Sequence, residues 1–303
     1  MAIQWYPGHM HKAQKEMRQV LPKVDVIIEI LDARIPFSSE NPMLAQIRSN
    51  KPCLKVLAKS DLADSTQLAV WQEYLERERH IKTLAISTLN PEKMHQVPLL
   101  CAKLAPEKSR SIKNVRAMIA GIPNVGKSTL INILAGRVIA KTGNEPAVTK
   151  TQQTIHLDDG GLTLLDTPGI LWPKQELEDS SYRLAITGAI KDTAMDYDDI
   201  AFFAARYLMK AYPHVLLKRY ELDELPEGEL EFFEIIGRRR GCLSRGGRVD
   251  LVKISELFIG DIRTGRFGTL CWETPEMIVE EKARLEQQKV EKKERDERRK
   301  TKR

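Results

Sequence analysis

Residues 115–136 read VRAMIAGIPNVGKSTLINILAG, an apolar run that passes through a glycine-rich turn into a helical pattern. Residues 121–128 fit the pattern G-x-x-x-x-G-K-[ST], at the end of a predicted strand and the start of a predicted helix, where that pattern functions. Glycines let backbone N–H groups converge, and the helix N-terminus favours negative charge. The stretch therefore predicts a phosphate-binding loop in an α/β domain rather than an ordinary glycine-rich turn.

The side chains of this loop predict how a nucleotide is held. We expect Lys127 to neutralise the β and γ phosphates, which also makes it a candidate catalytic residue, and Ser128 to bind Mg²⁺. The residues of the loop that we expect to contact the nucleotide are Asn124, Val125, Gly126, Lys127, Ser128 and Thr129.

Stretches of strand length lie on both sides of the loop. Apolar runs at 24–31, 53–58 and 81–87 precede it, and two further short strands are plausible after it, at 152–157 and 162–165. Helical patterns separate several of these runs. Strands that alternate with helices are typical of a mainly parallel sheet with crossover helices. The sequence therefore predicts an α/β fold with a sheet of about six strands and flanking helices.

The pattern changes near residue 175. From 176 to 275 apolar residues recur at helical spacing, as in 200–212 and 230–240, which predicts a small all-helical domain after a first domain over 1–175. Residues 276–303 read as a charged tail, either a solvated helix or disordered. From Glu280 onward the tail has 11 basic and 7 acidic residues, and it shows no apolar stripe wide enough to pack.

Composition excludes several classes of protein. The chain has 303 residues and a net charge of +6 at pH 7, which suits a polyanionic partner. Its four cysteines are far apart, which disfavours a zinc ribbon or a disulfide framework. No apolar run reaches about 18 residues, so we expect no membrane-spanning helix. We expect a monomeric cytoplasmic protein that binds neither membranes nor DNA.

A second motif, Asp166-Thr-Pro-Gly169, follows the run at 162–165. We expect Asp166 to hold Mg²⁺ through water and the N–H of Gly169 to bind the γ phosphate, although such a sequence is also a reasonable turn. Thr149, in the polar loop 141–153, is the candidate that closes over Mg²⁺ and the γ phosphate during catalysis. Other threonines nearby compete for this role: Thr142, Thr151 and Thr154.

The candidate base-binding motifs precede the phosphate loop. GTPases read guanine with N-K-x-D and a short serine-containing loop, and both normally follow the phosphate motifs. Here Ala58-Lys59-Ser60-Asp61 ends the run at 53–58, and Ser87-Thr88 ends the run at 81–87. This order matches a circularly permuted GTPase. Because ligands of open α/β sheets bind at the carboxyl ends of strands, the permutation leaves the site unchanged in principle.

One residue departs from the guanine-reading pattern. Ala58 stands where such motifs usually have Asn. Asp61 is still able to accept the guanine N1–H and N2–H, and the Lys59 stem is still able to cover the base. The lost amide predicts nucleotide binding weaker by about 1 kcal/mol or more.

Several motifs together resemble the RbgA/YlqF family of circularly permuted ribosome-assembly GTPases. They are WYPGHM (5–10), DARIP (32–36), the phosphate loop with Asn124, PAVT (146–149), DTPG (166–169), RRRGCLSRGGRVD (238–250) and RTGRFGTLCWETP (263–275). The resemblance covers roughly residues 1–275. It implies a Mg²⁺-dependent enzyme that hydrolyses GTP to GDP and phosphate on a late precursor of the large (50S) subunit and its rRNA, with hydrolysis timing release. The alternative is a nucleotide-gated rRNA-binding scaffold or chaperone for which hydrolysis is incidental.

The resemblance also implies two special residues. Ile170 occupies the position where many GTPases use Gln to orient water, and isoleucine is unable to do so. His9 is the implied replacement; alternatively it only fixes the N-terminal loop, and His11 is a nearby competitor. Asn124 is the implied ligand of K⁺ beside the phosphates, or else a loop-capping residue.

A cluster of arginines predicts an RNA contact. Residues 238–248 contain Arg238, Arg239, Arg240, Arg245 and Arg248 and no acidic residue. Such a cluster suits the phosphate backbone of structured RNA. The alternative is a solvated helix end whose cations complement the helix dipole.

Overall fold

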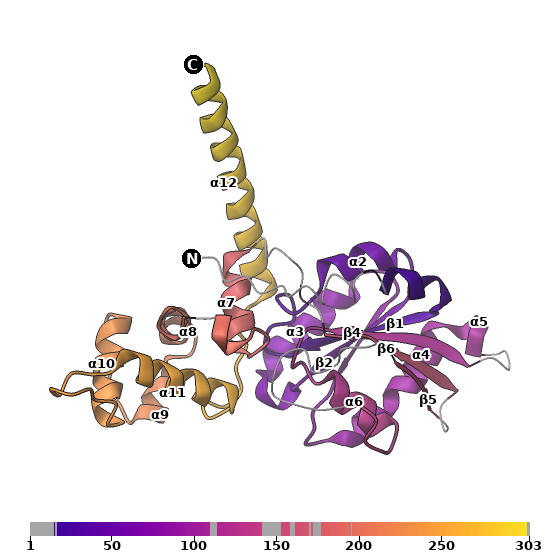
Figure 1. The fold of residues 1–303 in the computed structure, drawn as a ribbon, viewed down its shortest axis with the longest axis horizontal. Helices are drawn as coiled ribbons and strands as arrows, with labels where there is room; N and C mark the ends of the chain where they lie inside the picture. Colours follow the sequence, from indigo (N-terminus) through magenta and orange to yellow (C-terminus); the bar gives the residue numbers. More distant parts are fainter. Residues whose placement is uncertain are drawn as a thin grey trace.

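The computed structural model describes residues 15, 17–109, 114–140, 153–157, 161–169, 171, 177–194 and 196–301. The described chain forms a sheet with flanking helices, a group of helices beside it, and one long helix that projects away from both (Figure 1). Among the described residues, no helix is both long enough and apolar enough to cross a bilayer.

The sheet contains all of the expected strands. They are β1 (Val26–Asp32), β2 (Cys53–Ala58), β3 (Ile81–Ala85), β4 (Val115–Gly121), β5 (Gln153–Leu157) and β6 (Leu162–Asp166). Their spatial order is β3-β2-β1-β4-β6-β5, with β5 antiparallel to β6 and the other neighbours parallel. The predicted mainly parallel six-stranded sheet is thus confirmed.

Helices on both faces explain why the central strands are mainly apolar and fully buried. Every residue of β1 and β2 is buried, as expected when crossover helices cover both faces. The helices of this part are α2 (Pro42–Arg48), α3 (Ser65–Glu76), α4 (Gln96–Leu104), α5 (Pro106–Ser109) and α6 (Lys127–Leu134). Short 3₁₀ turns connect them at Leu21–Lys23, Ser60–Leu62 and Pro91–His95.

The strand order places the two groups of motifs at one edge of the sheet. β1 lies between β2, which leads into the candidate base motif, and β4, which leads into the phosphate loop. β6, which ends in Asp166, lies beside β4. The sheet therefore joins motifs that are separated and reordered in the sequence, as expected for a permuted chain.

The second part of the chain is helical, as predicted. Its elements are α7 (Glu178–Ile186), a 3₁₀ turn (Asp192–Ala194), α8 (Tyr197–Ala211), α9 (Pro213–Tyr220), α10 (Glu229–Arg239) and α11 (Leu251–Arg263). Phe232, Phe233 and Phe258 are buried at its centre, with edge-to-face ring contacts. Such contacts add to the burial energy of the rings and explain the helical spacing of the apolar residues.

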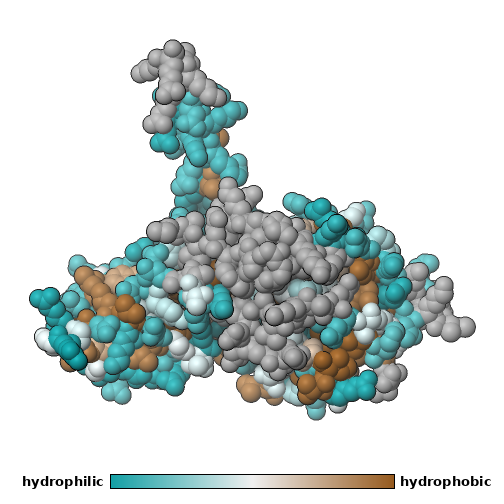
Figure 2. All heavy atoms as spheres, in the orientation of Figure 1, coloured by the Kyte–Doolittle hydropathy of each residue, from teal (hydrophilic) through white to brown (hydrophobic). Residues whose placement is uncertain are grey.

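The projecting helix is α12 (Pro275–Thr301). The expectation that this segment has no apolar stripe wide enough to pack is wrong for its first turns. Its first turns do pack: Ile278 is 1% exposed and lies in an apolar cluster with Trp71 of α3. Arg183 of α7 forms an ion pair with Glu281. A few well-placed residues are enough to anchor a helix whose remaining length is solvated. Figure 2 shows that the projecting part is mainly hydrophilic, with isolated hydrophobic spots.

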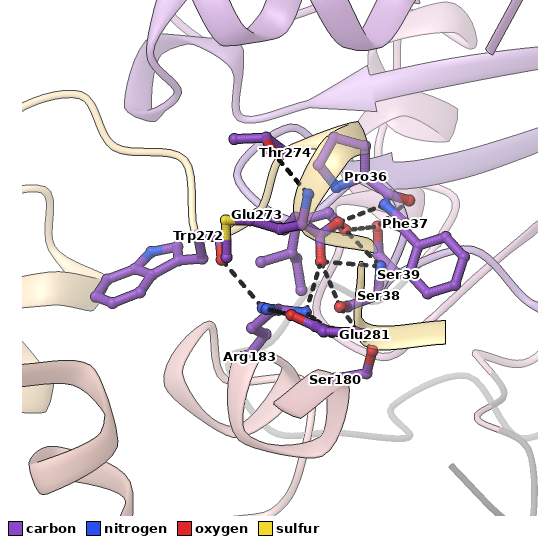
Figure 3. A network of polar contacts seen from close by, with 12 residues as sticks. Pro36, Phe37, Ser38, Ser39, Ser180, Arg183, Trp272, Glu273, Thr274 and Glu281 are labelled. Carbon is purple, nitrogen blue, oxygen red and sulfur yellow. Dashed lines mark hydrogen bonds and ion pairs between the residues drawn. The ribbon is translucent and has the colours of Figure 1, made fainter. Parts of the chain in front are cut away.

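A buried carboxylate joins the two parts at the base of α12. The Glu273 side chain is 0% exposed and accepts hydrogen bonds from the backbone N–H groups of Phe37 and Ser38 and from the Ser38 hydroxyl. Arg183 lies 3.7 Å from the same carboxylate and donates to the carbonyl of Trp272 (Figure 3). The segment after α11 thus returns to the sheet and fixes the helical part against it.

Candidate nucleotide-binding site

The phosphate loop is shaped by close backbone packing. A Cβ on Gly121 would lie 2.8 Å from the carbonyl oxygen of Ile30, so only glycine fits at the end of β4. Asn124 (φ 56°) and Gly126 (φ 103°) adopt left-handed backbone conformations. A Cβ on Gly169 would lie 3.2 Å from the backbone of Pro123. The Asp-Thr-Pro-Gly segment therefore rests directly against the loop, as a γ-phosphate contact requires.

Lys127 and Asp166 form a buried ion pair at the centre of the site. The Lys127 Nζ lies 2.5 Å from the Asp166 Oδ1, and the side chains are 6% and 1% exposed. Burial raises the pKa of Asp166, against the pull of Lys127, and burial lowers the pKa of Lys127. Each charge is thus stabilised mainly by the other. Phosphates would supply Lys127 with alternative negative partners.

The geometry around Asp166 fits a magnesium ion. Its Oδ2 is buried and makes no hydrogen bond to any described residue, and Ser128 follows Lys127 in the first turn of α6. Oxygen ligands are those that Mg²⁺ prefers, and it usually takes one or two from the protein and the rest from phosphates and water. The described residues contain no cluster of three or more His, Cys, Asp or Glu side chains suited to a metal. Bound there, Mg²⁺ would neutralise developing phosphate charge.

The base motif lies beside the phosphate loop. A Cβ on Gly126 would lie 3.9 Å from the Cβ of Ala58. Asp61 accepts a 2.6 Å hydrogen bond from the Ser87 hydroxyl, which in turn accepts from the N–H of Leu89. The structure therefore brings together the predicted base motif, the serine loop and the phosphate loop.

Two residues of the site were not among the predicted site residues. Asp32 ends β1, and its carboxylate lies 3.0 Å from the Lys59 Nζ. Arg34 holds the same carboxylate through Nε and Nη2 at 2.9 and 2.8 Å. The signal in the sequence was the Asp-Ala-Arg run at the end of an apolar strand, at the edge where ligands bind.

Asn124 connects the phosphate loop to the helical part. Its side-chain Nδ2 donates a 2.9 Å hydrogen bond to the carbonyl oxygen of Gly188, in the turn that follows α7. Arg263 of α11 donates to the carbonyls of Ala185 and Ile186 at the end of α7. The end of α7 is therefore held from both the loop and the helical part.

The remaining predicted site residues divide into three groups. His9 and Thr149 lie outside the described residues. Val125 is buried, Thr129 is partly buried, and Thr88 is exposed in the serine loop. The five arginines of 238–248 are all exposed, but Arg239 donates to the carbonyls of Tyr220 and Glu221 at the end of α9. That contact gives Arg239 a structural role.

Together, the sheet and the site define a P-loop GTPase with circularly permuted motifs. Comparisons support this class: a family model described as 50S ribosome-binding GTPase matches residues 116–211. The ribosome biogenesis GTPase A of Bacillus licheniformis is 47% identical over 283 residues, covering 91% of this chain and 99% of the relative. That of Thermotoga maritima is 30% identical over 277 residues, covering 91% and 96%.

A solved structure agrees with these relatives. The crystal structure of GNP-bound YlqF from T. maritima superposes with a TM-score of 0.61 at 26% identity, covering 88% of this chain and 99% of that one. The chain belongs to the ribosome biogenesis GTPase A family. It is a GTPase that binds guanine nucleotide, which confirms the resemblance seen in its motifs.

Proposed function

We propose that this GTPase acts on a late precursor of the large ribosomal subunit and that GTP hydrolysis times its release. The observation that carries the proposal is the hydrogen bond from Asn124 to the carbonyl of Gly188. It joins the loop that would hold the phosphates to the turn after α7, the first helix of the helical part. A change in the bound phosphates would therefore be transmitted through this hydrogen bond to the helical part, which carries the arginine cluster. The relatives' names, which refer to ribosome biogenesis, support this partner.

We assign the roles of the site residues from their motifs and, for the described residues, from their positions; the roles of His9 and Thr149 rest on the motifs and the resemblance alone. Lys59 and Asp61 bind guanine, assisted by Ala58, Ser87 and Thr88. Lys127 and the loop residues Asn124 to Thr129 hold the phosphates, and Gly169 contacts the γ phosphate. Ser128, Asp166 and Thr149 hold Mg²⁺. His9 orients the attacking water, and Asn124 is a ligand of K⁺.

The helical part provides the contact with rRNA. Arg238, Arg240, Arg245 and Arg248 are exposed, and the described chain places them on and after α10. Exposed arginines suit phosphate contacts because each neutralises charge and releases counterions. We place Arg239 at the edge of this surface, since its guanidinium also caps α9. The protein acts as a monomer in the cytoplasm.

Two features of the sequence favour a second candidate, a nucleotide-gated scaffold on rRNA. Ala58 provides no amide for the base or the phosphate loop, and Ile170 is unable to orient water. Both features suit a protein whose nucleotide controls binding while turnover is incidental.

Hydrolysis measurements separate the two candidates. GTP and ATP turnover is measured with and without purified 50S subunits, in KCl and in NaCl. We expect turnover that is specific for GTP, stimulated by the particle and faster in KCl. GTP-dependent particle binding without stimulation would favour the scaffold. The absence of both particle binding and stimulation would contradict the ribosomal partner.

A further inference from the structure

The carboxylate of Asp32 lies at the centre of a buried polar cluster beside the base motif. Its Oδ1 accepts from the backbone N–H and the Nε of Arg34, and its Oδ2 accepts from the Arg34 Nη2 and the Lys59 Nζ. Asp32 and Arg34 are 2% and 3% exposed, whereas the Lys59 side chain is 28% exposed. The cluster therefore leaves part of only one side chain, that of Lys59, open to solvent.

The charge on Asp32 is maintained by its neighbours. Although burial opposes ionisation, the Arg34 and Lys59 cations hold the pKa of Asp32 well below its usual range. The carboxylate is therefore ionised at neutral pH. Arg34 is itself held in place, because its Nη2 also reaches the carbonyl oxygen of Thr187 at 3.5 Å.

A fixed ammonium group restricts the lysine stem. A lysine side chain has about 2 kcal/mol of rotamer entropy to lose when it is ordered. Lys59 has a left-handed backbone conformation (φ 58°), and its Nζ is tethered 3.0 Å from Asp32. Both ends of the methylene stem are thus fixed before any base arrives. Preorganisation of this kind strengthens binding by reducing the entropy lost on association.

We propose that Asp32, braced by Arg34, is a positioning residue that holds the Lys59 stem in the orientation that covers the guanine base. The inference rests on the proposed base-binding role of Lys59. It assigns to the Asp-Ala-Arg run a part in nucleotide affinity without direct contact with the nucleotide. The tether matters more in this chain because Ala58 has no amide to connect the base motif to the phosphate loop.

The test is a double-mutant cycle on the full-length protein. GDP affinity is measured by calorimetry with Mg²⁺ for the parent, Asp32→Asn, Lys59→Met and the double variant. We expect each single change to weaken binding about tenfold, as for the loss of one charge-assisted interaction. Because Asp32 acts through Lys59, the double variant should bind within about twofold of Lys59→Met. At saturating GTP, Asp32→Asn should keep the parent's kcat and raise only KM.

Controls separate positioning from general damage to the fold. Glu29→Gln is the matched control, since Glu29 is another buried carboxylate on β1 but faces Lys55 instead of Lys59. It should leave GDP affinity unchanged. Should Asp32→Asn unfold, the variant Asp32→Asn/Arg34→Met removes the buried cation together with its partner and enters the cycle in its place.

The outcomes that would overturn the inference are distinct. Unchanged GDP affinity in Asp32→Asn, or losses that multiply to about a hundredfold in the double variant, would mean that Asp32 does not act through Lys59. Unchanged affinity in Lys59→Met would overturn the base-site assignment, and the inference with it. A fall in kcat with an unchanged KM would place Asp32 in the chemical step instead.

Discussion

The side-chain amide of Asn124 and the carbonyl oxygen of Gly188 are 2.9 Å apart and joined by a hydrogen bond across 64 positions of sequence. One residue lies in the phosphate loop, and the other follows the first helix after the Asp-Thr-Pro-Gly segment. The contact means that the helical part touches the nucleotide site directly, in addition to its covalent connection through residues 170–177. Coupling between nucleotide and partner is therefore expected to depend on this bond.

Replacing Asn124 tests that coupling. Asn124→Gly removes the amide but tolerates the left-handed backbone that an alanine would strain. We expect the unfolding free energy to fall by about 1 kcal/mol for the lost hydrogen bond. The difference between GTP-analogue and GDP affinities for 50S particles should also shrink. Particle binding assays with both nucleotides check this, and an undiminished difference would exclude the bond as the route.

The ion pair between Lys127 and Asp166 predicts that nucleotide stabilises a weakened variant. Asp166→Asn leaves a buried ammonium without a counter-charge, which costs about 3 kcal/mol. Thermal unfolding of the nucleotide-free protein should show this loss, and GTP should restore part of it by giving Lys127 phosphate oxygens. Hydrolysis by Asp166→Asn should also require a higher Mg²⁺ concentration than hydrolysis by the parent. Glu107→Gln, an exposed carboxylate on α5, is the control and should change neither property.

Ala58→Asn should strengthen nucleotide binding. The Ala58 Cβ lies close to the phosphate loop at Gly126, so an amide there has the loop and the base edge within reach. We expect GDP to bind tighter by about 1 kcal/mol, roughly fivefold. Calorimetry measures the change. Because Ala58 is only 5% exposed, a lower melting temperature with unchanged affinity would show instead that the larger side chain overpacks the strand end.

Glu29 predicts a specific pH dependence of stability. Burial, only partly offset by Lys55, raises the pKa of Glu29 from 4.5 to about 7. A carboxyl group with a raised folded-state pKa contributes stability below its unfolded value, and that contribution is lost as pH rises through the folded value. As the pH rises from 4.5 to 7, the parent should lose unfolding free energy relative to Glu29→Gln, because glutamine does not ionise. Denaturant titrations across this range test it; a constant difference would refute it.

The arginine surface predicts a change in salt dependence. Replacing Arg238, Arg240 and Arg245 with alanine should weaken binding to rRNA and reduce the slope of log affinity against log salt by about one for each lost phosphate contact. Arg77→Ala, an exposed arginine on the sheet domain, is the matched control. Arg239→Ala should instead lower thermal stability, because Arg239 caps α9. An unchanged slope in the triple variant would place the RNA contact elsewhere.

Local patterns were sufficient for the architecture. Apolar runs predicted most of the strands because a strand buried on both faces consists mainly of apolar residues, as in β1 and β2. The buried charges within these two strands, Glu29, Asp32 and Lys55, are paired. The glycine-rich turn predicted the phosphate loop because a side chain at Gly121 would collide with Ile30. The order of the motifs predicted the permutation, since strand ends converge whatever their order in the chain.

The charged tail shows a contact that local patterns did not predict. Its composition predicted a solvated segment, and most of α12 is exposed. Its base is packed all the same, because Ile278 and Glu281 meet Trp71 and Arg183 from elements far away in sequence. Periodicity within the tail contains no information about those partners.

The sequence by itself therefore determined the elements, their alternation and the chemistry of the phosphate loop, since these depend on neighbouring residues. Only the tertiary structure decided the pairing of buried charges: Lys127 with Asp166, Lys59 with Asp32, and Arg183 with Glu273 and Glu281. Each buried charge requires a partner, but the partner is chosen by the packing of distant segments. In this protein those choices connect the base site, the phosphate loop and the helical part.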